Sequence, residues 1–336
     1  MKAVGFYKCL NTNNYESLVD FEIERPEPIG KDLLVRVRAV SVNPIDTKVR
    51  YSKEKTGSSP TILGWDVAGV VEKVGEDCKL FKPGDEVYYA GSITRPGANC
   101  EFHLVDERLV GVKPSSIDFA SAAALPLTVL TAWEALFERL EVNNYSLEQK
   151  TILIIGAAGG VGSIATQLAK LAGLTVIGTA SRPETIKWVK ENGADFVINH
   201  FTEFSTQFKG IGYKSVDYIL CLNDPGKYWD EMCEFIVPQG RICSIVDASK
   251  EVNLSLLKNK SVTFSWEFMF TRSMYETEDM IEQHNILNLV SELIDDQSLF
   301  TTVKEILRPI NAQNLELAHS NLESGRTIGK IVLKDF

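Results

Sequence analysis

The sequence predicts an α/β protein with a doubly wound parallel sheet, joined to a second domain that is mainly β. Two patterns along the chain support this prediction. Beyond Leu125, strand-like runs alternate with helical stretches, which is typical of parallel strands connected by crossover helices. Before that point, short strands are separated by Pro-Gly and Gly-Glu-Asp turns. We therefore expect one domain over residues 1–122 and 271–336, and the parallel sheet over residues 123–270.

The mainly β domain is expected to draw on both ends of the chain. In its first part, the residue pattern favours strands at Leu33–Val42, Val67–Val74 and Glu86–Tyr89. The alternation of strands and helices stops near the end of the parallel sheet. The last part of the chain then indicates a long amphipathic helix at about Glu278–Asp295 and a final strand at Gly329–Leu333.

A glycine-rich turn between a strand and a helix is the most informative motif. Thr151–Ile155 carries no charge and is rich in β-branched residues, as expected for a strand buried on both faces. The helical pattern Ser163–Ala172 follows the turn. Glycines there let the backbone approach a pyrophosphate closely, and the helix N-terminus offers free N–H groups. Residues 123–270 are therefore expected to bind a dinucleotide, with loop contacts from Gly156, Ala158, Gly159, Gly160 and Val161.

The end of the second parallel strand, Thr175–Ala180, predicts which dinucleotide binds. Proteins that bind NAD usually place a carboxylate there for the ribose 2′-hydroxyl. This chain has Thr179, Ser181 and Arg182 instead, and a hydroxyl with a guanidinium suits a 2′-phosphate. We therefore expect NADPH. In an alternative interpretation, which is compatible with the first, Ser181 caps a helix that starts at Pro183 and Arg182 is solvated.

The remaining strands of the parallel sheet place further residues near the cofactor. Three more strands are expected at Phe196–Asn199, Val216–Leu222 and Arg241–Val246, the last of them after a turn at Pro238–Gly240. Two helices are expected between the strands, at Pro183–Asn192 and about Lys227–Phe235. Ligands bind outside the carboxyl ends of such strands. The residues expected to line the nicotinamide through backbone contacts are Cys221, Leu222, Val246 and Asp247.

Composition limits the partners and the compartment. The net charge of −10 disfavours a broad surface for nucleic acid or an anionic membrane. No apolar run is long enough to span a membrane, and the first residues resemble a strand rather than a signal peptide. The six cysteines form no C-x-x-C pair, which is typical of reduced thiols. We therefore expect a cytoplasmic protein that acts on a small molecule.

Several segments together resemble one family. Asn43–Asp46, Gly64–Gly75, Arg95–Phe102 and Gly156–Gly162 are similar to the medium-chain dehydrogenase/reductase superfamily, on its quinone oxidoreductase side. Trp266–Arg272 resembles the bacterial branch called zinc-type alcohol dehydrogenase-like. The resemblance covers the whole chain and implies a Rossmann dinucleotide-binding domain with a GroES-like substrate domain.

The same resemblance raises the question of a metal. Zinc-dependent relatives build the catalytic site from a Cys, a His-Glu pair and a later Cys or Asp. The matching positions here are Asn43, Trp65 and Asp66, and nothing near Thr128 supplies a thiolate. Relatives with a structural zinc have four closely spaced cysteines, where this chain has Cys100. Because zinc needs a set of N, S or O ligands, we predict that the protein holds no metal.

Without a Lewis acid, alcohol oxidation is disfavoured, whereas an electron-poor acceptor still takes hydride readily. The leading hypothesis is therefore an NADPH-dependent reductase of a quinone or an α,β-unsaturated carbonyl. A dinucleotide sensor without turnover is the alternative from another class. A zinc-dependent alcohol dehydrogenase or a lyase ranks below both.

Candidate site residues fall into three groups, each with a simpler alternative. The catalytic candidates are Asn43, Thr128 and Lys48, and the alternatives are an Asn-Pro turn, a hydroxyl bonded to its own helix and a solvated lysine. Aromatic side chains that could wall a substrate pocket, or belong to the core, are Tyr51, Trp65, Trp266 and Phe268. The resemblance adds the cofactor contacts Thr131, His200 and Lys330.

An apolar strand at Val262–Trp266 follows the fifth parallel strand and should lie at the edge of the sheet. Exposed edges of this kind are usually paired, and two-fold pairing gives a continuous sheet across a dimer. The family resemblance also points to a homodimer.

Overall fold

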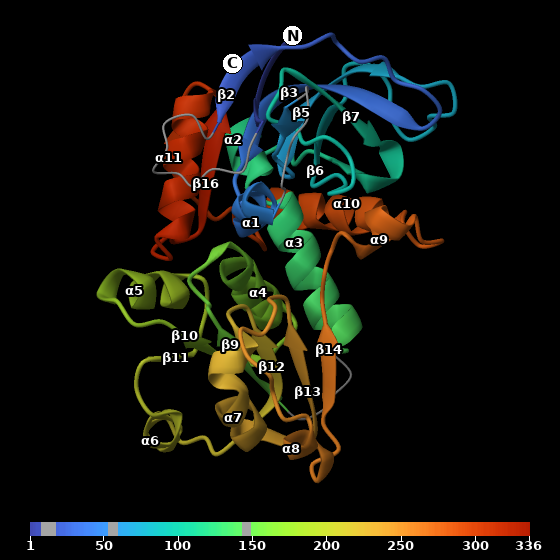
Figure 1. Cartoon of the computed structure of the whole chain (residues 1–336). Coiled ribbons are helices and arrows are strands. Elements are labelled where there is room, and N and C mark those ends of the chain that lie inside the picture. Colours follow the sequence, from blue (N-terminus) through green and yellow to red (C-terminus); the bar gives the residue numbers. More distant parts are fainter. Residues whose placement is uncertain (8–17, 53–59, 143–148) are drawn as a thin grey trace. The chain divides into compact units, whose positions relative to one another are not determined.

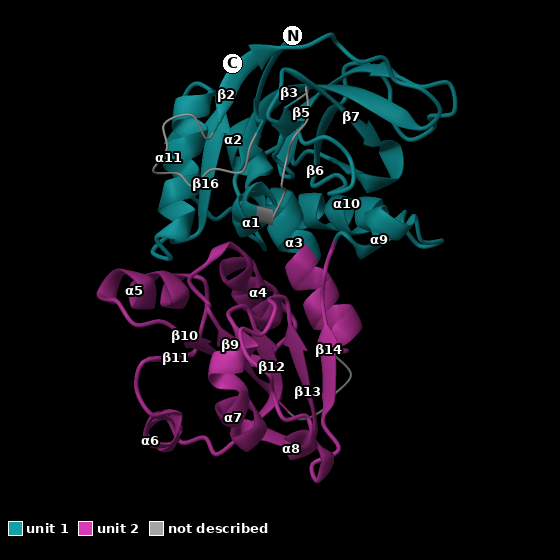
Figure 2. Cartoon of the chain, viewed as in Figure 1, with its two compact units in different colours: residues 1–130, 270–336 teal, residues 131–269 magenta. Residues whose placement is uncertain are grey.

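The computed structural model describes residues 1–7, 18–52, 60–142 and 149–336. The chain forms two compact units (Figure 2): unit 1 comprises residues 1–130 and 270–336, and unit 2 comprises residues 131–269. The first boundary falls inside a continuous helix, α3 (Pro126–Trp133), rather than in the loop that precedes it. No helix in the described ranges is long and apolar enough to cross a membrane.

Unit 2 is built on a parallel sheet, which confirms the predicted fold class. In the described part of the unit, its strand order is β11-β10-β9-β12-β13-β14 (Figure 1). The strands are β9 (Thr151–Ile155), β10 (Thr175–Thr179), β11 (Phe196–Ile198), β12 (Val216–Cys221), β13 (Ile236–Ser244) and β14 (Thr263–Trp266). The chain moves outward from β9 to β11 and then returns to the other side of β9. The point of reversal, between β9 and β12, is where such sheets bind ligands.

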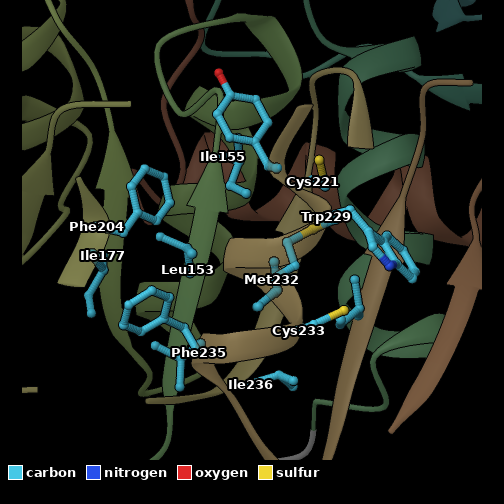
Figure 3. Packing of buried hydrophobic residues seen from close by; sticks show 14 of the residues in the cluster. Leu153, Ile155, Ile177, Phe204, Cys221, Trp229, Met232, Cys233, Phe235 and Ile236 are labelled. Atoms are coloured by element: carbon cyan, nitrogen blue, oxygen red, sulfur yellow. The ribbon is translucent and has the colours of Figure 1, made fainter. Parts of the chain in front are cut away.

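Helices connect these strands and bury one aromatic core. They are α4 (Gly160–Leu171), α5 (Pro183–Glu191), α6 (Phe204–Gly210), α7 (Pro225–Phe235) and α8 (Ser255–Lys258), after a π-helical segment, η2 (Glu134–Arg139). Figure 3 shows Phe204, Trp229 and Phe235 against Leu153 and Ile155 of the central strand. This core packs the helices against the sheet and so fixes the positions at which the loops leave the strand ends.

Three predicted boundaries in the chain were wrong. β13 starts at Ile236, five residues before the predicted Arg241, because the predicted turn is a bulge inside the strand: Gln239 has a φ of 63°, and the register with β12 shifts there. The helix after the glycine turn starts at Gly160 rather than at residue 163. The long C-terminal helix starts at Glu282 rather than at residue 278.

Unit 1 contains two sheets in its described part. The larger has the order β15-β16-β3-β5-β6-β8, with β7 also paired to β3, and the smaller has the order β2-β1-β4. The strands are β1 (Lys2–Phe6), β2 (Val19–Glu22), β3 (Asp32–Ser41), β4 (Thr61–Ile62), β5 (Val67–Val74), β6 (Glu86–Tyr89), β7 (Phe102–Asp106), β8 (Val110–Val112), β15 (Val303–Leu307) and β16 (Lys330–Lys334). The helices are α1 (Pro44–Ser52), η1 (Glu107–Leu109), α2 (Phe119–Ala123), most of α3, α9 (Thr271–Tyr275), α10 (Glu282–Asp295) and α11 (Ala312–Glu323).

The pairing of β16 with β3 positions the polar residues of unit 1. These strands are antiparallel, and Val332 lies opposite Ser41. The start of β16 therefore lies beside the end of β3, where α1 begins. This arrangement brings Lys330 to Asn43, although almost the whole chain separates them in sequence.

Candidate functional site

The turn between β9 and α4 in unit 2 requires glycine at two positions. Gly156 has a φ of +90°, a left-handed conformation that side chains rarely adopt. A Cβ on Gly162 would lie 2.4 Å from the Gly156 carbonyl oxygen. The first N–H of the turn, that of Gly156, donates to the Thr179 hydroxyl at 3.0 Å, which ties the turn to the end of β10. Strand, turn and helix are therefore held closely together.

The start of α4 is suited to an anion. Gly159 is the N-cap and provides no side chain to accept a hydrogen bond from the first turn. The backbone from Ala158 to Val161 is half-buried, so a ligand can reach it. The N–H groups of a first helical turn have no partner within the helix, and the helix dipole adds partial positive charge. A dinucleotide pyrophosphate fits this arrangement.

The end of β10 presents a hydroxyl and a guanidinium. The N-cap of α5 is Arg182, whose N–H donates to the Thr185 hydroxyl at 3.0 Å. The interpretation that Ser181 caps this helix is therefore wrong, because the helix starts one residue later than a Ser181 cap requires. Arg182 Nε lies 3.3 Å from an Oε1 of the exposed Glu184 in the same helix. A ribose 2′-phosphate beside Ser181 would meet donors rather than a carboxylate on β10.

The other predicted cofactor contacts in unit 2 differ in accessibility. Burial raises the pKa of the Cys221 thiol to about 12, and its Sγ donates to the Asn223 carbonyl at 3.1 Å, so this thiol is unreactive. Leu222 and Val246 are half-buried and Asp247 is exposed. His200 follows β11, is half-buried, and burial lowers its pKa. These residues, like Thr131 at the start of unit 2, remain predictions as cofactor contacts.

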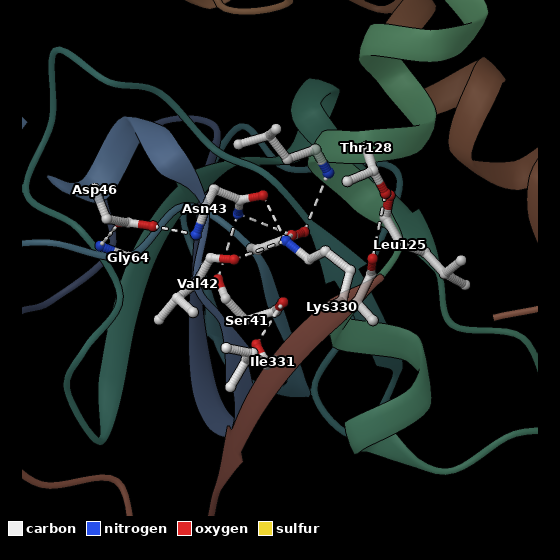
Figure 4. Close-up of polar contacts among 12 residues, drawn as sticks. Ser41, Val42, Asn43, Asp46, Gly64, Leu125, Thr128, Lys330 and Ile331 are labelled. Atoms are coloured by element: carbon white, nitrogen blue, oxygen red, sulfur yellow. Dashed lines mark hydrogen bonds and ion pairs between the residues drawn. The ribbon is translucent and has the colours of Figure 1, made fainter. Parts of the chain in front are cut away.

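Unit 1 contains a buried polar network around Lys330 (Figure 4). Lys330 Nζ donates to Asp66 Oδ2 at 2.9 Å, to the Val42 carbonyl at 3.0 Å and to Asn43 Oδ1. Asn43 Nδ2 donates to Asp66 Oδ2 at 3.0 Å. The Lys330 and Asp66 side chains are 3% and 0% exposed. An ion pair with so many hydrogen bonds holds all three side chains in one geometry.

A second carboxylate, Asp46, ties this network to the backbone. Its Oδ2 accepts from the Asn43 N–H at 2.7 Å and its Oδ1 accepts from the Gly64 N–H at 3.0 Å. Burial raises the pKa of Asp46 to about 7, and the backbone donors and Lys330 oppose that rise. Asp66 Oδ1 accepts from the Leu127 N–H at 3.1 Å. The two carboxylates therefore fix the starts of α1 and α3.

This network bears on the roles predicted for its members. Lys330 stays a prediction as a cofactor contact, and its three N–H donors are all used inside unit 1. Asn43 Nδ2 donates mainly to Asp66, and its other contact, to the Ser41 carbonyl, is long at 3.4 Å. The Lys330 ammonium group stands among the oxygens of Val42, Asn43 and Asp66, so this donor set does not suit a catalytic metal. Within the described residues, no group of three His, Cys, Asp or Glu side chains is placed to hold one.

The other two catalytic candidates lie outside the network. The Thr128 hydroxyl donates to the Leu125 carbonyl at 2.9 Å, the back-bonded alternative, although its lone pairs can still accept a hydrogen bond. Lys48 is exposed on α1.

Of the four predicted pocket aromatics, Trp65 lines a cavity of about 750 Å³ within unit 1, together with Phe21, Ile62 and Phe102. Trp65 is buried, and its Nε1 donates to the Ser92 carbonyl at 3.0 Å. Tyr51 is exposed on α1 and does not line this cavity, and Trp266 and Phe268 are exposed residues of unit 2.

Two features were missed in the sequence. Asp46 follows Asn43 at the spacing of a helix capping box, which is a readable signal. The proximity of Glu134 to Glu267 in unit 2 had no such signal, because it depends on how the chain after β14 folds back toward η2.

Comparison with known proteins identifies relatives over the whole chain. Residues 30–121 match the alcohol dehydrogenase GroES-like domain and residues 160–283 match the zinc-binding dehydrogenase domain. A zinc-type alcohol dehydrogenase-like protein of Staphylococcus epidermidis is 42% identical, over 99% of both chains. A putative zinc-dependent alcohol dehydrogenase of Rhizobium etli has a TM-score of 0.95 and 50% identity, over 100% of this chain and 98% of that one. Escherichia coli quinone oxidoreductase, solved with NADPH, has a TM-score of 0.84 and 27% identity over 99% of this chain and 100% of that one.

Proposed function

This chain belongs to the medium-chain dehydrogenase/reductase superfamily, and on that premise we propose that it reduces a quinone or an α,β-unsaturated carbonyl with NADPH and without zinc. The superfamily consists of NAD(P)H-dependent oxidoreductases, and this chain is an oxidoreductase of that kind. The observation that carries the finer proposal is the Lys330–Asp66 ion pair, because it occupies with an ammonium group the oxygens of Asn43 and Asp66, two of the positions that the resemblance matches to zinc ligands.

The choice of NADPH is supported by the end of β10. The backbone N–H groups at the start of α4 would hold the pyrophosphate, and Ser181 and Arg182 would hold the 2′-phosphate. The Escherichia coli quinone oxidoreductase was solved with NADPH. We expect NADPH to bind about tenfold more tightly than NADH, which corresponds to about 1.4 kcal/mol.

The substrate chemistry follows from the charges in unit 1. A bound reduced nicotinamide supplies a hydride. The positive charge of Lys330 is neutralised by Asp66, so this buried network offers no strong electrophile to polarise an unactivated carbonyl. Asn43 is the proposed donor to the substrate oxygen, since its 3.4 Å contact with Ser41 is easily exchanged. The Trp65 cavity has the size of a small-molecule site, but Asn43 does not line it, so we do not assign the acceptor to that cavity.

Steady-state kinetics test this proposal. The protein should oxidise NADPH in the presence of 1,4-quinones or α,β-unsaturated ketones, and simple primary alcohols with NADP should give no measurable rate. Asn43→Ala should lower the rate with quinone by about ten- to a hundredfold, as expected for the loss of one donor to an oxyanion. Alcohol oxidation faster than quinone reduction would refute the assignment. Tight NADPH binding without turnover of either substrate class would favour a dinucleotide sensor.

The cofactor preference is tested separately. Arg182→Ala should remove most of the preference for NADPH and leave the NADH affinity nearly unchanged. Lys187→Ala, an exposed position on the same helix α5, is the matched control and should keep the preference. Equal binding of both nucleotides to the parent protein would show that Arg182 is only a helix-start residue.

A further inference from the structure

Two buried glutamates lie close together near the end of the edge strand β14 in unit 2. Glu267 directly follows β14 and its side chain is 0% exposed. Glu134 begins the π-helical segment η2 and is also buried. Their carboxyl groups lie close enough for Glu134 to raise the pKa of Glu267, and both Glu267 oxygens are buried without a hydrogen bond from the described residues. An ionised carboxylate can only accept, so a hydrogen bond between the two groups requires a proton on one of them.

The surrounding charges favour a single shared proton. Arg139 Nε lies 2.8 Å from Glu267 Oε2, so one positive charge faces the pair. With one proton, the pair carries one negative charge and balances Arg139; without it, the buried cluster carries an excess negative charge. Burial and the Glu134 charge raise the pKa of Glu267 to about 9. The other titratable groups that act on this site are Glu138, which raises the pKa of Glu267, and the buried thiol Cys243.

The π-helix explains why Glu134 and Arg139 both reach Glu267. In an α-helix, residues five apart lie on different faces. In η2 the hydrogen bonds span five residues, as in the 2.9 Å bond from Leu140 N–H to the Ala135 carbonyl. The wider turn brings residues 134 and 139 toward one side. Such segments are unfavourable and occur frequently at functional sites.

The backbone of Glu267 lies at the edge of the sheet where the dinucleotide is proposed to bind. Its N–H donates to the Ser244 carbonyl at 2.9 Å, which continues the ladder between β13 and β14. The glycine turn after β9 would hold the pyrophosphate, and the end of β10 would hold the adenosine ribose. Since β12, β13 and β14 lie on the other side of β9, the nicotinamide half of a bound dinucleotide would extend toward their carboxyl ends.

We propose that Glu134 and Glu267 share one proton, and that this pair is a positioning device that fixes the chain at the end of β14 for the nicotinamide half of the dinucleotide. The inference rests on the proposed dinucleotide-binding function. When the proton is lost, the two buried carboxylates repel each other and the chain from Trp266 to Phe268 shifts. Nucleotide affinity then falls as pH rises through the titration of the pair.

The test compares nucleotide affinity with pH in matched variants. In Glu267→Gln, the amide N–H donates to Glu134 and the amide oxygen accepts from Arg139, so the variant copies the protonated pair and cannot titrate. The parent protein should lose at least about fivefold in NADPH affinity between pH 7.5 and pH 10, which corresponds to about 1 kcal/mol. Glu267→Gln should change less than about twofold over the same range. Glu138→Gln removes a charge that raises the pKa of Glu267, so this variant should still lose affinity but at a lower pH than the parent.

A second readout detects the proton directly. At pH 8.5, where Asp46 with its pKa of about 7 is largely ionised, the parent protein should show a stronger infrared band of protonated carboxyl groups than Glu267→Gln. Parallel pH profiles for the parent and Glu267→Gln, or bands of equal strength in both proteins, would overturn the inference while leaving the proposed function intact. Failure to bind NADPH or NADH at any pH would refute the proposed function and this inference with it. Binding without turnover leaves the pH test decisive.

Discussion

Replacing Lys330 with Met should destabilise unit 1 strongly. Asp66 is 0% exposed, and Lys330 is its charged partner at 2.9 Å. After the substitution the carboxylate keeps only the hydrogen bonds from Asn43 and the Leu127 N–H. Removing one partner of a buried ion pair typically costs about 3–5 kcal/mol, because an uncompensated charge stays in the interior. The methionine fills most of the lysine volume, so a cavity adds little.

The pH dependence of this loss identifies its cause. Burial raises the pKa of Asp66 above its ordinary value, and Lys330 lowers it, so the variant has a still higher pKa. A group whose folded pKa exceeds its unfolded pKa favours folding below the unfolded value, and that contribution is lost as pH rises through the folded pKa. The penalty in Lys330→Met should therefore be small near pH 4 and grow toward pH 8.

Urea unfolding at pH 5 and pH 8 measures this penalty, with hydrogen exchange of the β3 and β16 amides reporting on unit 1. The matched control is the double variant Asp66→Asn with Lys330→Met, which removes both charges and should recover more than half of the lost free energy of unfolding. A loss below about 1 kcal/mol, within the range of an exposed pair, would refute the reasoning. So would a loss that is equal at both pH values, or a double variant no more stable than the single one.

Three further predictions follow from the same geometry. Gly162→Ala should lower the free energy of unfolding by about 1–3 kcal/mol in a denaturation experiment, because its new Cβ would lie 2.4 Å from the Gly156 oxygen. A Cβ on Gly159 would meet only an oxygen at 3.7 Å, so Gly159→Ala should keep its stability but bind NADPH less tightly in a titration. Elemental analysis should find less than about one-tenth of an equivalent of zinc, and chelators should leave the activity unchanged; stoichiometric zinc would contradict the Lys330 assignment. The β14 edge should pair with its copy across a homodimer, so sedimentation should show a dimer, and Trp266→Lys should weaken the association. A single 37.4 kDa species at micromolar concentration would exclude the homodimer.

The local patterns of the sequence predicted most of the fold, because they arise from short stretches of chain. The strands at Val67–Val74 and Glu86–Tyr89 have the bounds expected from their residues. The end of β13 was predicted at Val246, two residues beyond Ser244, and its start was predicted five residues too late, since the irregularity at Gln239 depends on the register with β12 rather than on local propensity. Helix starts were uncertain by three or four residues where no side-chain cap marks them, as at Gly160 and Glu282.

The buried contacts of the site were not predictable in the same way. Lys330 reaches Asp66 over 264 residues of chain, and only the pairing of β16 with β3 brings them together. A Gly-Lys dipeptide gives no indication that its ammonium group is buried. In the sequence, Glu267 is one charged residue in an aromatic stretch. Its protonation depends on the π-helical segment η2, which no local sequence pattern predicts. Sequence reasoning therefore found the residues that shape the backbone and missed those whose role depends on burial.

The charge balance of the buried cluster around Lys330 bears on the reaction. Around Lys330 a full positive charge is neutralised by Asp66, and the ammonium protons are all bound. A substrate oxygen near Asn43 would therefore meet a hydrogen bond of ordinary strength rather than a strong Lewis acid. Such a donor stabilises an oxyanion by a few kcal/mol, which suffices when the acceptor is already electron-poor. Quinones and conjugated carbonyls meet that condition, and simple alcohols do not, because forming an alkoxide needs a larger shift in pKa than one amide provides.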